Sequence, residues 1–222
     1  ADPEFNPLRL EHGSVDDVTH SIVETEEGKL EERTNTIFSP QEFVVNIGPQ
    51  HPATHGVLRL RTSLDGETVK KIDVYCGYVH RGIEKLCESL TYPQTLHFAD
   101  RLDYLSAQQN RHAVCLCIED ALQVEVPARA QYIRTIMDEL MRISSHLLFW
   151  STFCMDLGGT TAFFYGFRDR EKILDIFEET CGARMTFNYY TIGGLMADLH
   201  PDFQRKVKEF CAYMPAKLKE YH

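Results

Sequence analysis

Residues 127–150 constrain the fold most, because they combine the length and the periodicity of a long amphipathic helix. Apolar side chains recur at helical spacing along one face, at Ile133, Met137, Leu140 and Leu147. This spacing is typical of a helix that packs one side against a core. Proline is favoured in the first helical turn, where its missing N–H removes no intrahelical hydrogen bond. We therefore predict a long helix beginning at Pro127 and an α-rich core around it.

Two later segments repeat this pattern. Residues 167–182 (FRDREKILDIFEETCG) predict an amphipathic helix with Gly182 as its C-cap, since glycine accepts the left-handed backbone that closes many helices. After Pro201, apolar residues again share one face of a predicted helix: Phe203, Val207, Phe210 and Met214. Residues 91–122 predict a longer helix that breaks near its start, and residues 82–90 predict a short one.

The segment before these helices carries strand signals. Residues 57–64 alternate leucine with polar side chains, and the Asp-Gly pair at 65–66 is a hairpin turn signal. Residues 67–75 supply the return strand, with Ile72 and Val74 on one face. We therefore predict an α+β, mostly α fold, in which a small N-terminal antiparallel sheet precedes a helical bundle.

The two ends of the chain bear on its domain organisation. Residues 1–36 are rich in charge and poor in aromatic side chains, which is typical of a flexible N-terminal tail or linker. We expect one domain over residues 37–222. The sequence stops at His222 within a helical pattern, so we expect this domain to be the N-terminal part of a longer one.

Composition excludes several classes of protein. A net charge of −10, with basic residues interleaved among acids, disfavours nucleic-acid binding, which normally needs a basic stripe. The seven cysteines contain no CxxC pair, which favours reduced, mostly buried thiols in a compartment like the cytosol. Cys115 and Cys117 leave different faces of a helix, so metal ligation by this chain alone is not expected. No run approaches the roughly 18 apolar residues that span a bilayer.

The stretch GPQHPATHGVLRL, residues 48–60, presents two histidines on a backbone stiffened by glycine and proline. A histidine on such a loop is available to a ligand, although either one could instead bond the loop to itself. His51 suits that structural role better. His55, beside Gly56 at the entrance to a strand, suits a functional role better.

A second candidate stretch is DRLDYLS, residues 100–106. Arg101 and Tyr104 are three residues apart, so they would face the same way on a helix. Arg101 could equally form a surface salt bridge with Asp100 or Asp103. Tyr104 could be a core aromatic whose hydroxyl is hydrogen-bonded.

Asp156 is a third candidate, because it lies between apolar residues just before a glycine pair at 158–159. An acidic side chain in such a place must be solvated, paired with a cation or used as a helix cap. Capping is the simplest of these roles.

Several stretches together resemble one known family. They are VNIGPQHPATHGVLRL, GYVHRGIEK, TYPQTLHFADRLDYLS, EVPARAQYIRTIMDELMRISSHL, DLGGTTAFFYGFRDRE and GARMTFNYYTIGG. In order and spacing they are similar to the quinone-site subunit of respiratory complex I, the 49-kDa or D subunit of NADH–quinone oxidoreductase. The resemblance runs from about residue 42 to residue 222, and the family's C-terminal half is missing here.

That family resembles in turn the large subunit of nickel–iron hydrogenases, which holds its metal pair with cysteines. The resemblance puts Asp103 and Ser106 where hydrogenases have one CxxC pair, and a soft metal pair is poorly served without thiolates. It therefore implies a metal-free cavity for quinone. A membrane-bound hydrogenase subunit and a non-catalytic scaffold for the cluster subunit are the alternatives.

The resemblance also assigns roles to single residues. Tyr104 and His55 would bond the two carbonyl oxygens of the quinone headgroup, and Asp156 would pair with His55. Because an opposite charge favours the ionised form, Asp156 would favour the imidazolium of His55. Arg101 and Arg81 would lie beside a terminal [4Fe–4S] cluster, whose cysteines a partner subunit provides. Their fixed positive charge would favour the reduced state of that cluster.

The activity that the resemblance implies is NADH:quinone oxidoreduction coupled to proton translocation, and it belongs to the whole complex. We expect this chain alone to be inactive and to bind no flavin or nicotinamide. Expected partners are the cluster subunit, the membrane-arm subunit at the quinone channel, and quinone itself. The expected location is the cytoplasmic face of the bacterial inner membrane, or the matrix side in mitochondria, with membrane contact through partners.

Two positions depart from the family pattern. Many members carry histidine at the position of Thr186, near the cluster, and arginine at that of Thr191. Threonine does not titrate near neutral pH, so we expect a cluster potential that depends weakly on pH. A low-potential quinone such as menaquinone would suit this arrangement.

Overall fold

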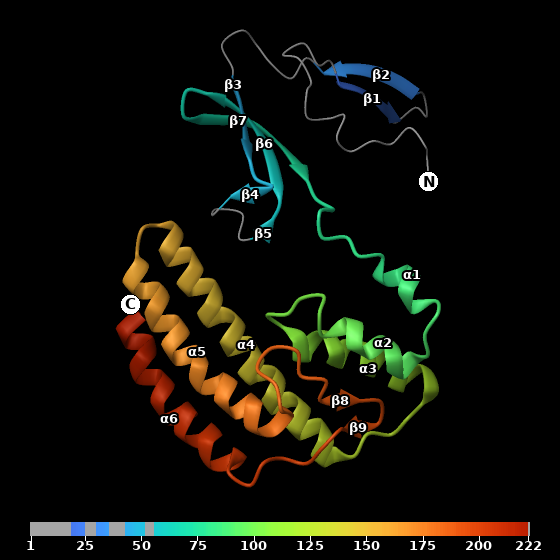
Figure 1. The fold of residues 1–222 in the computed structure, drawn as a ribbon, viewed down its shortest axis with the longest axis vertical. Helices are drawn as coiled ribbons and strands as arrows, with labels where there is room; N and C mark the ends of the chain where they lie inside the picture. The colour runs from blue at the N-terminus through green and yellow to red at the C-terminus, as the bar shows by residue number, and fades with distance from the viewer. Residues whose placement is uncertain (1–18, 25–29, 36–42, 52–55, 222) are drawn as a thin grey trace. The chain divides into compact units, whose positions relative to one another are not determined.

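The computed structural model describes residues 19–24, 30–35, 43–51 and 56–221. The chain divides into two compact units, residues 1–80 and residues 81–222. The first unit is built from strands and the second mostly from helices, which confirms the α+β, mostly α class (Figure 1).

A three-stranded antiparallel sheet with the order β3–β6–β7 forms the centre of the first unit. β3 spans Phe43–Ile47, β6 spans Arg59–Asp65 and β7 spans Thr68–Tyr75. The last two strands form the predicted hairpin, which is confirmed. Gly66 in its turn has a φ of 61°, a backbone angle that glycine adopts without steric cost.

One face of this sheet is apolar, because directly opposed residues point their side chains to the same side. Val45 pairs with Thr62, and Thr62 pairs with Ile72. Ile72 and Val74 lie on one face of β7, as predicted, and are 48% and 61% exposed. Thr62, which pairs with Ile72 from the central strand, is 3% exposed, so this face is open over β7 and not across the whole sheet.

Two short strands frame the predicted histidine loop. β4 (Gln50–His51) pairs antiparallel with β5 (Gly56–Val57). Gly48 precedes them with a φ of 90°, and a Cβ there would lie 1.8 Å from the carbonyl oxygen of Leu58. Only glycine fits this close approach, so the entrance to the loop is fixed by its backbone.

A separate hairpin lies within the predicted tail. β1 (Thr19–Glu24) and β2 (Leu30–Asn35) pair antiparallel. The charged, aromatic-poor composition gives no sign of these strands. The flexible tail or linker over 1–36 and the single domain over 37–222 stay predictions.

The second unit is helical, and Figure 1 shows its α4, α5 and α6 side by side. The helices that the structure describes are α1 (Ile83–Cys87), α2 (Tyr92–Ala99), α3 (Ala107–Leu122), α4 (Ala128–Asp156), α5 (Thr160–Cys181) and α6 (Phe203–Tyr221). α4 packs against both α3 and α5, and α5 packs against α6. α4 is therefore the central helix of this unit.

The structure confirms the three main predicted helices. Pro127 is the N-cap of α4, immediately before its first helical residue. The predicted inner face of α4 is buried: Ile133, Met137, Leu140 and Leu147. Gly182 caps α5 with a φ of 75°, and the buried residues of α6 include Phe203, Phe210 and Met214. Each fully buried side chain of this size contributes about 1.5–3 kcal/mol to folding.

Two predicted helix boundaries were wrong. Residues 91–122 form two helices, α2 and α3, and the break falls at residues 100–106 rather than near the start. α5 begins at Thr160, earlier than the predicted start at residue 167. Its early part contains Gly166, where a Cβ would lie 1.9 Å from the Ser151 hydroxyl oxygen. Glycine lowers helix propensity, but here it lets α5 approach α4 closely.

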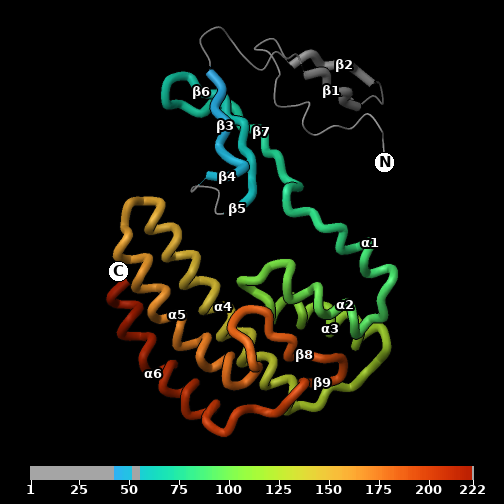
Figure 2. Tube along the Cα trace, in the orientation of Figure 1, coloured from blue at the N-terminus to red at the C-terminus, as the bar shows by residue number. Residues whose placement is uncertain are grey.

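The segment between α5 and α6 carries a short hairpin that packs onto α3 and α4. Figure 2 traces this segment through β8 (Tyr190–Thr191) and β9 (Gly194–Leu195) to the start of α6. β8 contacts α3 and β9 contacts α4. Phe187, Tyr189 and Tyr190 are buried, so this irregular segment belongs to the core.

No helix in the described part of the chain is both long enough and apolar enough to cross a membrane.

Candidate functional site

Residues 100–106 form a tight, non-helical turn between α2 and α3. Backbone bonds of the 3₁₀ type start it, with the Arg101 N–H donating to the Phe98 oxygen at 2.9 Å. The Asp103 carboxylate accepts the Leu105 N–H at 3.1 Å, a local bond that competes with helix formation. Asn110, on α3, donates its amide to the Asp103 carbonyl oxygen at 3.0 Å. The turn is therefore held at its centre by the first part of α3.

Tyr104 lies within this turn and points a large part of its ring outward. It is 54% exposed, so the alternative of a core aromatic is wrong. Its hydroxyl has no hydrogen-bond partner among the residues that the structure describes. A phenol presented in this way is available to donate to a ligand oxygen.

Arg81 and Arg101 meet at the same turn. The Arg81 Nη2 donates to the Arg101 carbonyl oxygen at 2.7 Å, and the Arg101 Nη1 donates to the His97 carbonyl oxygen at 2.7 Å. Among the described residues Arg101 forms no ion pair, so the alternative of a salt bridge with Asp100 or Asp103 is wrong. Two exposed guanidinium groups thus lie at the start of the turn that carries Tyr104.

Asp156 is the last residue of α4 and is exposed. Gly159 is the N-cap of α5, so Asp156 is not its N-cap residue. A carboxylate at a helix C-terminus opposes the helix dipole, an effect of about 0.3–1 kcal/mol at exposed positions. Helix stability alone therefore does not favour an acidic side chain at this position.

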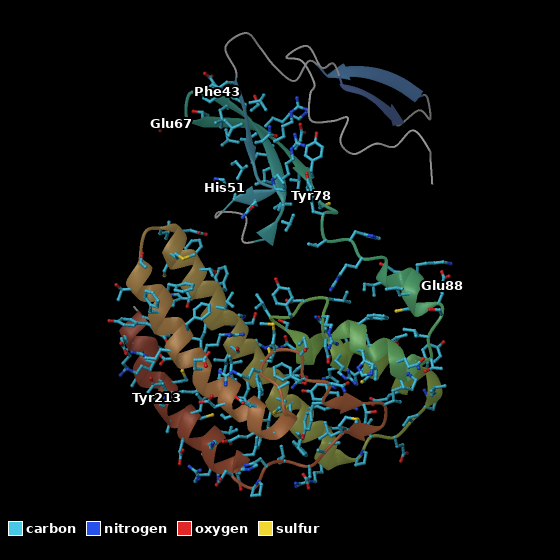
Figure 3. The ribbon with its side chains drawn as sticks, in the orientation of Figure 1. Phe43, His51, Glu67, Tyr78, Glu88 and Tyr213 are labelled. Carbon is cyan, nitrogen blue, oxygen red and sulfur yellow. The ribbon has the colours of Figure 1, made fainter. Side chains whose placement is uncertain are left out.

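The histidine loop is only partly described. His51 is exposed and pairs with Gly56 across β4 and β5 (Figure 3), which agrees with a structural role in the loop. His55 lies outside the described residues, in the segment that these strands bracket. The structure thus places Arg101 and Tyr104 in one turn that Arg81 contacts through the Arg101 carbonyl oxygen, while the pairing of His55 with Asp156 stays a prediction.

The turn begins at a buried ion pair. Asp100, directly after α2, and Arg111, on α3, are 1% and 3% exposed, and Arg111 Nη1 lies 3.2 Å from Asp100 Oδ2. The same carboxylate oxygen accepts the Asn188 N–H at 2.8 Å. Burial raises the pKa of Asp100, because Arg111 and the Asn188 N–H offset the loss of hydration only in part. Sequence reasoning missed this pair, because its two residues are 11 positions apart and on either side of a turn that periodicity did not place.

A second buried network joins α3, α4 and the β8–β9 hairpin. Arg134 forms two bonds with the Glu119 carboxylate, at 2.9 and 2.6 Å, and also donates to the Thr191 and Gly194 carbonyl oxygens. Burial alone would raise the pKa of Glu119, but the bonds from Arg134 and the Gly193 N–H outweigh it and lower that pKa. Glu119 is therefore held as an anion inside the unit.

Beside this ion pair, Asp138 links two aromatic side chains. Its carboxylate lies 2.5 Å from His112 Nδ1 and accepts the Tyr190 hydroxyl at 2.8 Å. The His112 and Tyr190 rings meet edge to face, 5.3 Å apart. These contacts fix the hairpin against the helices.

The burial of the cysteines differs from the one expected. All seven cysteines are described and free, but only Cys115 is buried, so the expectation of mostly buried thiols was wrong. The described residues contain no group of three or more histidine, cysteine or acidic side chains that could hold a metal ion. By resemblance, Asp103 and Ser106 stand at the positions where hydrogenases have cysteines. Their side chains carry oxygen atoms in place of thiols, and both residues lie in the turn before α3.

Comparisons with known proteins point to one family. The family described as "Respiratory-chain NADH dehydrogenase, 49 Kd subunit" matches residues 156–222. The C/D subunit of NADH-quinone oxidoreductase from Phocaeicola vulgatus is 65% identical over 221 residues, which is 100% of this chain and 43% of that protein. The C/D subunit from Bacteroides thetaiotaomicron is 63% identical over 222 residues, which is 100% of this chain and 42% of that protein. The D subunit from Bacillus cytotoxicus is 46% identical over 182 residues, 82% of this chain and 50% of that protein.

These matches define the class of the chain as a subunit of a respiratory-chain NADH dehydrogenase. More specifically, the chain belongs to the family of the 49-kDa, or D, subunit, and the resemblance seen in its motifs is confirmed. The chain spans half or less of the length of these relatives.

Proposed function

We propose that the chain forms part of the quinone-headgroup site of an NADH–quinone oxidoreductase, beside a terminal iron–sulfur cluster held by a partner subunit. The observation that carries this proposal is the presentation of Tyr104, with an exposed phenol, on a turn that is fixed by hydrogen bonds and begins with two exposed arginines in contact with each other. Membership of the D-subunit family supports it.

The chemistry that the site must perform suits these side chains. A quinone that takes up two electrons and two protons becomes a quinol, and each carbonyl oxygen becomes a hydroxyl. Tyr104 would donate a hydrogen bond to one carbonyl oxygen and His55 to the other, and His55 can pass a proton near neutral pH. Asp156 would orient His55 and favour its charged form. The electrons come from the partner's cluster.

The two arginines would act through charge. Arg81 and Arg101 carry fixed positive charge under all physiological conditions. Close to a cluster, positive charge stabilises the added electron and raises the reduction potential. Near a quinone it also stabilises negative charge that develops before protonation is complete.

The site implies partners and a location. The described residues hold no candidate metal-binding group, and the cysteine spacing offers no cluster ligands, so a partner subunit would supply them. Quinones partition into the bilayer, so the complex would sit at the membrane, with a membrane-arm subunit at the quinone channel. The proposed location is the cytoplasmic face of a bacterial inner membrane. The proposed activity is electron transfer to quinone coupled to proton translocation, and it needs the assembled complex.

The hydrogenase alternative is disfavoured by the turn itself. Asp103 uses its carboxylate to accept the Leu105 N–H, and no thiol lies at either position that resembles the hydrogenase pair. Metal analysis of the purified full-length complex distinguishes the two, because a hydrogenase would contain nickel and the proposed quinone site would not.

The test against the scaffold alternative uses two variants in the full-length, assembled complex. Tyr104→Phe and His55→Ala should each lower the NADH:quinone rate by at least about tenfold, since general acid–base groups typically contribute 10²–10⁴-fold. Electron transfer from NADH to ferricyanide, which does not need the quinone site, should stay unchanged. Tyr132→Phe, at another exposed tyrosine of the same unit, is the control. Unchanged quinone rates in both variants would favour a scaffold that binds no substrate.

A further inference from the structure

We propose that Asp100 and Arg111 are positioning residues for Tyr104: their buried pair fixes the 100–106 turn against residues 188–190 and so sets where the phenol meets the quinone. This inference rests on the proposed function of Tyr104. Neither residue would touch the quinone.

Asp100 joins two segments that are far apart in the chain. It directly follows α2 and opens the turn that carries Tyr104. Its Oδ2 accepts from Arg111 Nη1 at 3.2 Å and from the Asn188 N–H at 2.8 Å. Asn188 has a φ of 50°, a left-handed conformation that is uncommon for a residue other than glycine. The bond to Asp100 therefore also holds a backbone turn that would otherwise be less stable.

Arg111 extends the connection to a third element. From α3 its guanidinium donates to the Leu96 carbonyl oxygen of α2 at 3.1 Å and to the Tyr190 carbonyl oxygen of β8. One side chain thus ties α2, α3 and β8 at a single point. A planar guanidinium with several fixed donors can hold three acceptors in one geometry, which an ammonium group cannot do in the same way.

The centre of the turn is fixed as well. Asn110, also on α3, holds the Asp103 carbonyl oxygen at 3.0 Å. Tyr104 directly follows Asp103, so the backbone that leads into it is anchored at two points, by the bonds of Asp100 and by the bond from Asn110 to Asp103. Movement at either anchor changes the direction of the Tyr104 ring.

The energetics favour a positioning role over simple stabilisation. Asp100 Oδ1 is buried and has no hydrogen-bond partner among the described residues. A buried carboxylate with one unsatisfied oxygen is unfavourable, and well-packed apolar residues of similar volume often stabilise as much as a buried ion pair or more. What the pair offers that apolar residues do not is directional bonds to the Asn188 N–H and to two carbonyl oxygens.

The test measures quinone kinetics in the full-length, assembled complex. Asp100→Asn keeps the shape of the side chain but removes the charge that pairs with Arg111. We expect the KM for a short-chain quinone to rise about tenfold, because a displacement of about 1 Å at a reacting group has a large effect on rate and affinity. The NADH:ferricyanide rate should stay unchanged. Arg111→Lys, which keeps the charge but loses the three-way contact, should raise the KM in the same direction.

The matched control is Asp169→Asn. Asp169 is also fully buried and paired with an arginine, Arg168, and it bonds the Tyr213 hydroxyl between α5 and α6, but it contacts no residue of the turn. We expect it to lower thermal stability as Asp100→Asn does and to leave the quinone KM unchanged.

The outcomes separate this inference from the proposed function. If Tyr104→Phe impairs quinone reduction while Asp100→Asn and Arg111→Lys leave the KM unchanged, the positioning role is wrong. If neither variant assembles while Asp169→Asn does, Asp100 and Arg111 serve folding and the inference is also overturned. If Tyr104→Phe itself has no effect, there is no role of Tyr104 to support and the inference is overturned, and if His55→Ala also has no effect the proposed function fails.

Discussion

Buried polar side chains of the helical unit hold the irregular segment between α5 and α6 in place. Tyr190 is fully buried, and its hydroxyl donates to Asp138 Oδ1 at 2.8 Å and to the Arg134 carbonyl oxygen at 3.0 Å. Burial and the nearby Asp138 carboxylate raise the pKa of Tyr190 far above its ordinary value. The hydroxyl therefore stays protonated and acts as a permanent donor.

Removing that donor should destabilise the unit. In Tyr190→Phe, Asp138 loses a buried hydrogen bond, and we expect the free energy of unfolding to fall by about 1–3 kcal/mol. Tyr189→Phe is the control, because the Tyr189 hydroxyl bonds only the neutral Ala197 carbonyl oxygen, and its loss should be about 0.5–1.5 kcal/mol. Urea unfolding of the 1–222 chain measures both. A smaller effect at Tyr190 than at Tyr189 would contradict this account of the network.

The Asp169 carboxylate should make the free energy of unfolding depend on pH under acidic conditions. Burial alone would raise its pKa, but hydrogen bonds from Arg168, Tyr221 and Tyr213 outweigh burial and lower the pKa of Asp169 to about 2. A carboxyl whose pKa is lower in the folded state stabilises the fold above its unfolded pKa of about 4, and this contribution is lost as the pH falls from about 4 to 2. It amounts to about 2 kcal/mol.

The measurement compares unfolding at several acidic pH values. The difference in stability between the parent chain and Asp169→Asn should shrink as the pH falls from about 4 to 2. Asp198→Asn is the control, since Asp198 and its partner Arg129 are both exposed and such pairs contribute little. A constant difference at Asp169 across this range would show that its carboxyl does not titrate as described.

At the scale of elements, periodicity predicted the helices well and their ends less well. The inner faces of α4 and α6 follow directly from spacing, because apolar residues at helical period have one face to bury. The break at 100–106 was misplaced, since it depends on side-chain bonds from Asp103 and Asn110 rather than on a proline or glycine. The sequence shows no strand pattern at β8 and β9, because each strand is only two residues long.

The contact of α4 with α5 depends on Gly166. A Cβ there would meet the Ser151 hydroxyl oxygen at 1.9 Å and the Leu147 carbonyl oxygen at 3.0 Å. Gly166→Ala should therefore destabilise the fold by about 1–3 kcal/mol through overpacking, although alanine has the higher helix propensity. Chemical denaturation measures the loss.

Two further variants make this test specific. Ser151→Ala removes the oxygen that a Cβ at Gly166 would meet, so combined with Gly166→Ala it should recover part of the lost stability. Gly194→Ala should be close to neutral, because nothing lies within 4 Å of a Cβ at that position. If Gly166→Ala proves as neutral as Gly194→Ala, the close approach of the two helices is not the constraint.

For the whole molecule, motif resemblance identified the family and the candidate residues. The structure adds the contacts that hold the turn with Arg101 and Tyr104 in place. Tyr104 and Arg101 stand out in one motif, but exposure of the ring and the absence of a salt bridge among the described residues follow only from the folded turn. The bond between Asp100 and Asn188 joins residues 88 positions apart, a contact that one sequence without homologues does not reveal. The role of His55 rests on resemblance.

The position of Thr186 predicts a property of the assembled complex. Thr186 precedes Phe187 and Asn188 in the segment fixed by Asp100, and its side chain does not titrate. By resemblance Thr186 would lie near the partner's terminal cluster, so the reduction potential of that cluster should vary little between about pH 6 and 8, where a histidine would titrate. Redox titration followed by electron paramagnetic resonance measures it. Thr186→His should introduce a pH dependence, and a steep dependence in the parent complex would contradict the prediction.

Photolabelling shows whether this chain contacts the quinone headgroup. A photoreactive quinone is bound to the assembled, full-length complex, irradiated, and the labelled peptides are identified by mass spectrometry. We predict label in the peptide that contains residues 100–106 or in the one that contains His55, and its loss when excess unlabelled quinone competes. Label that competes away only from partner subunits, with none in this chain, would contradict the claim.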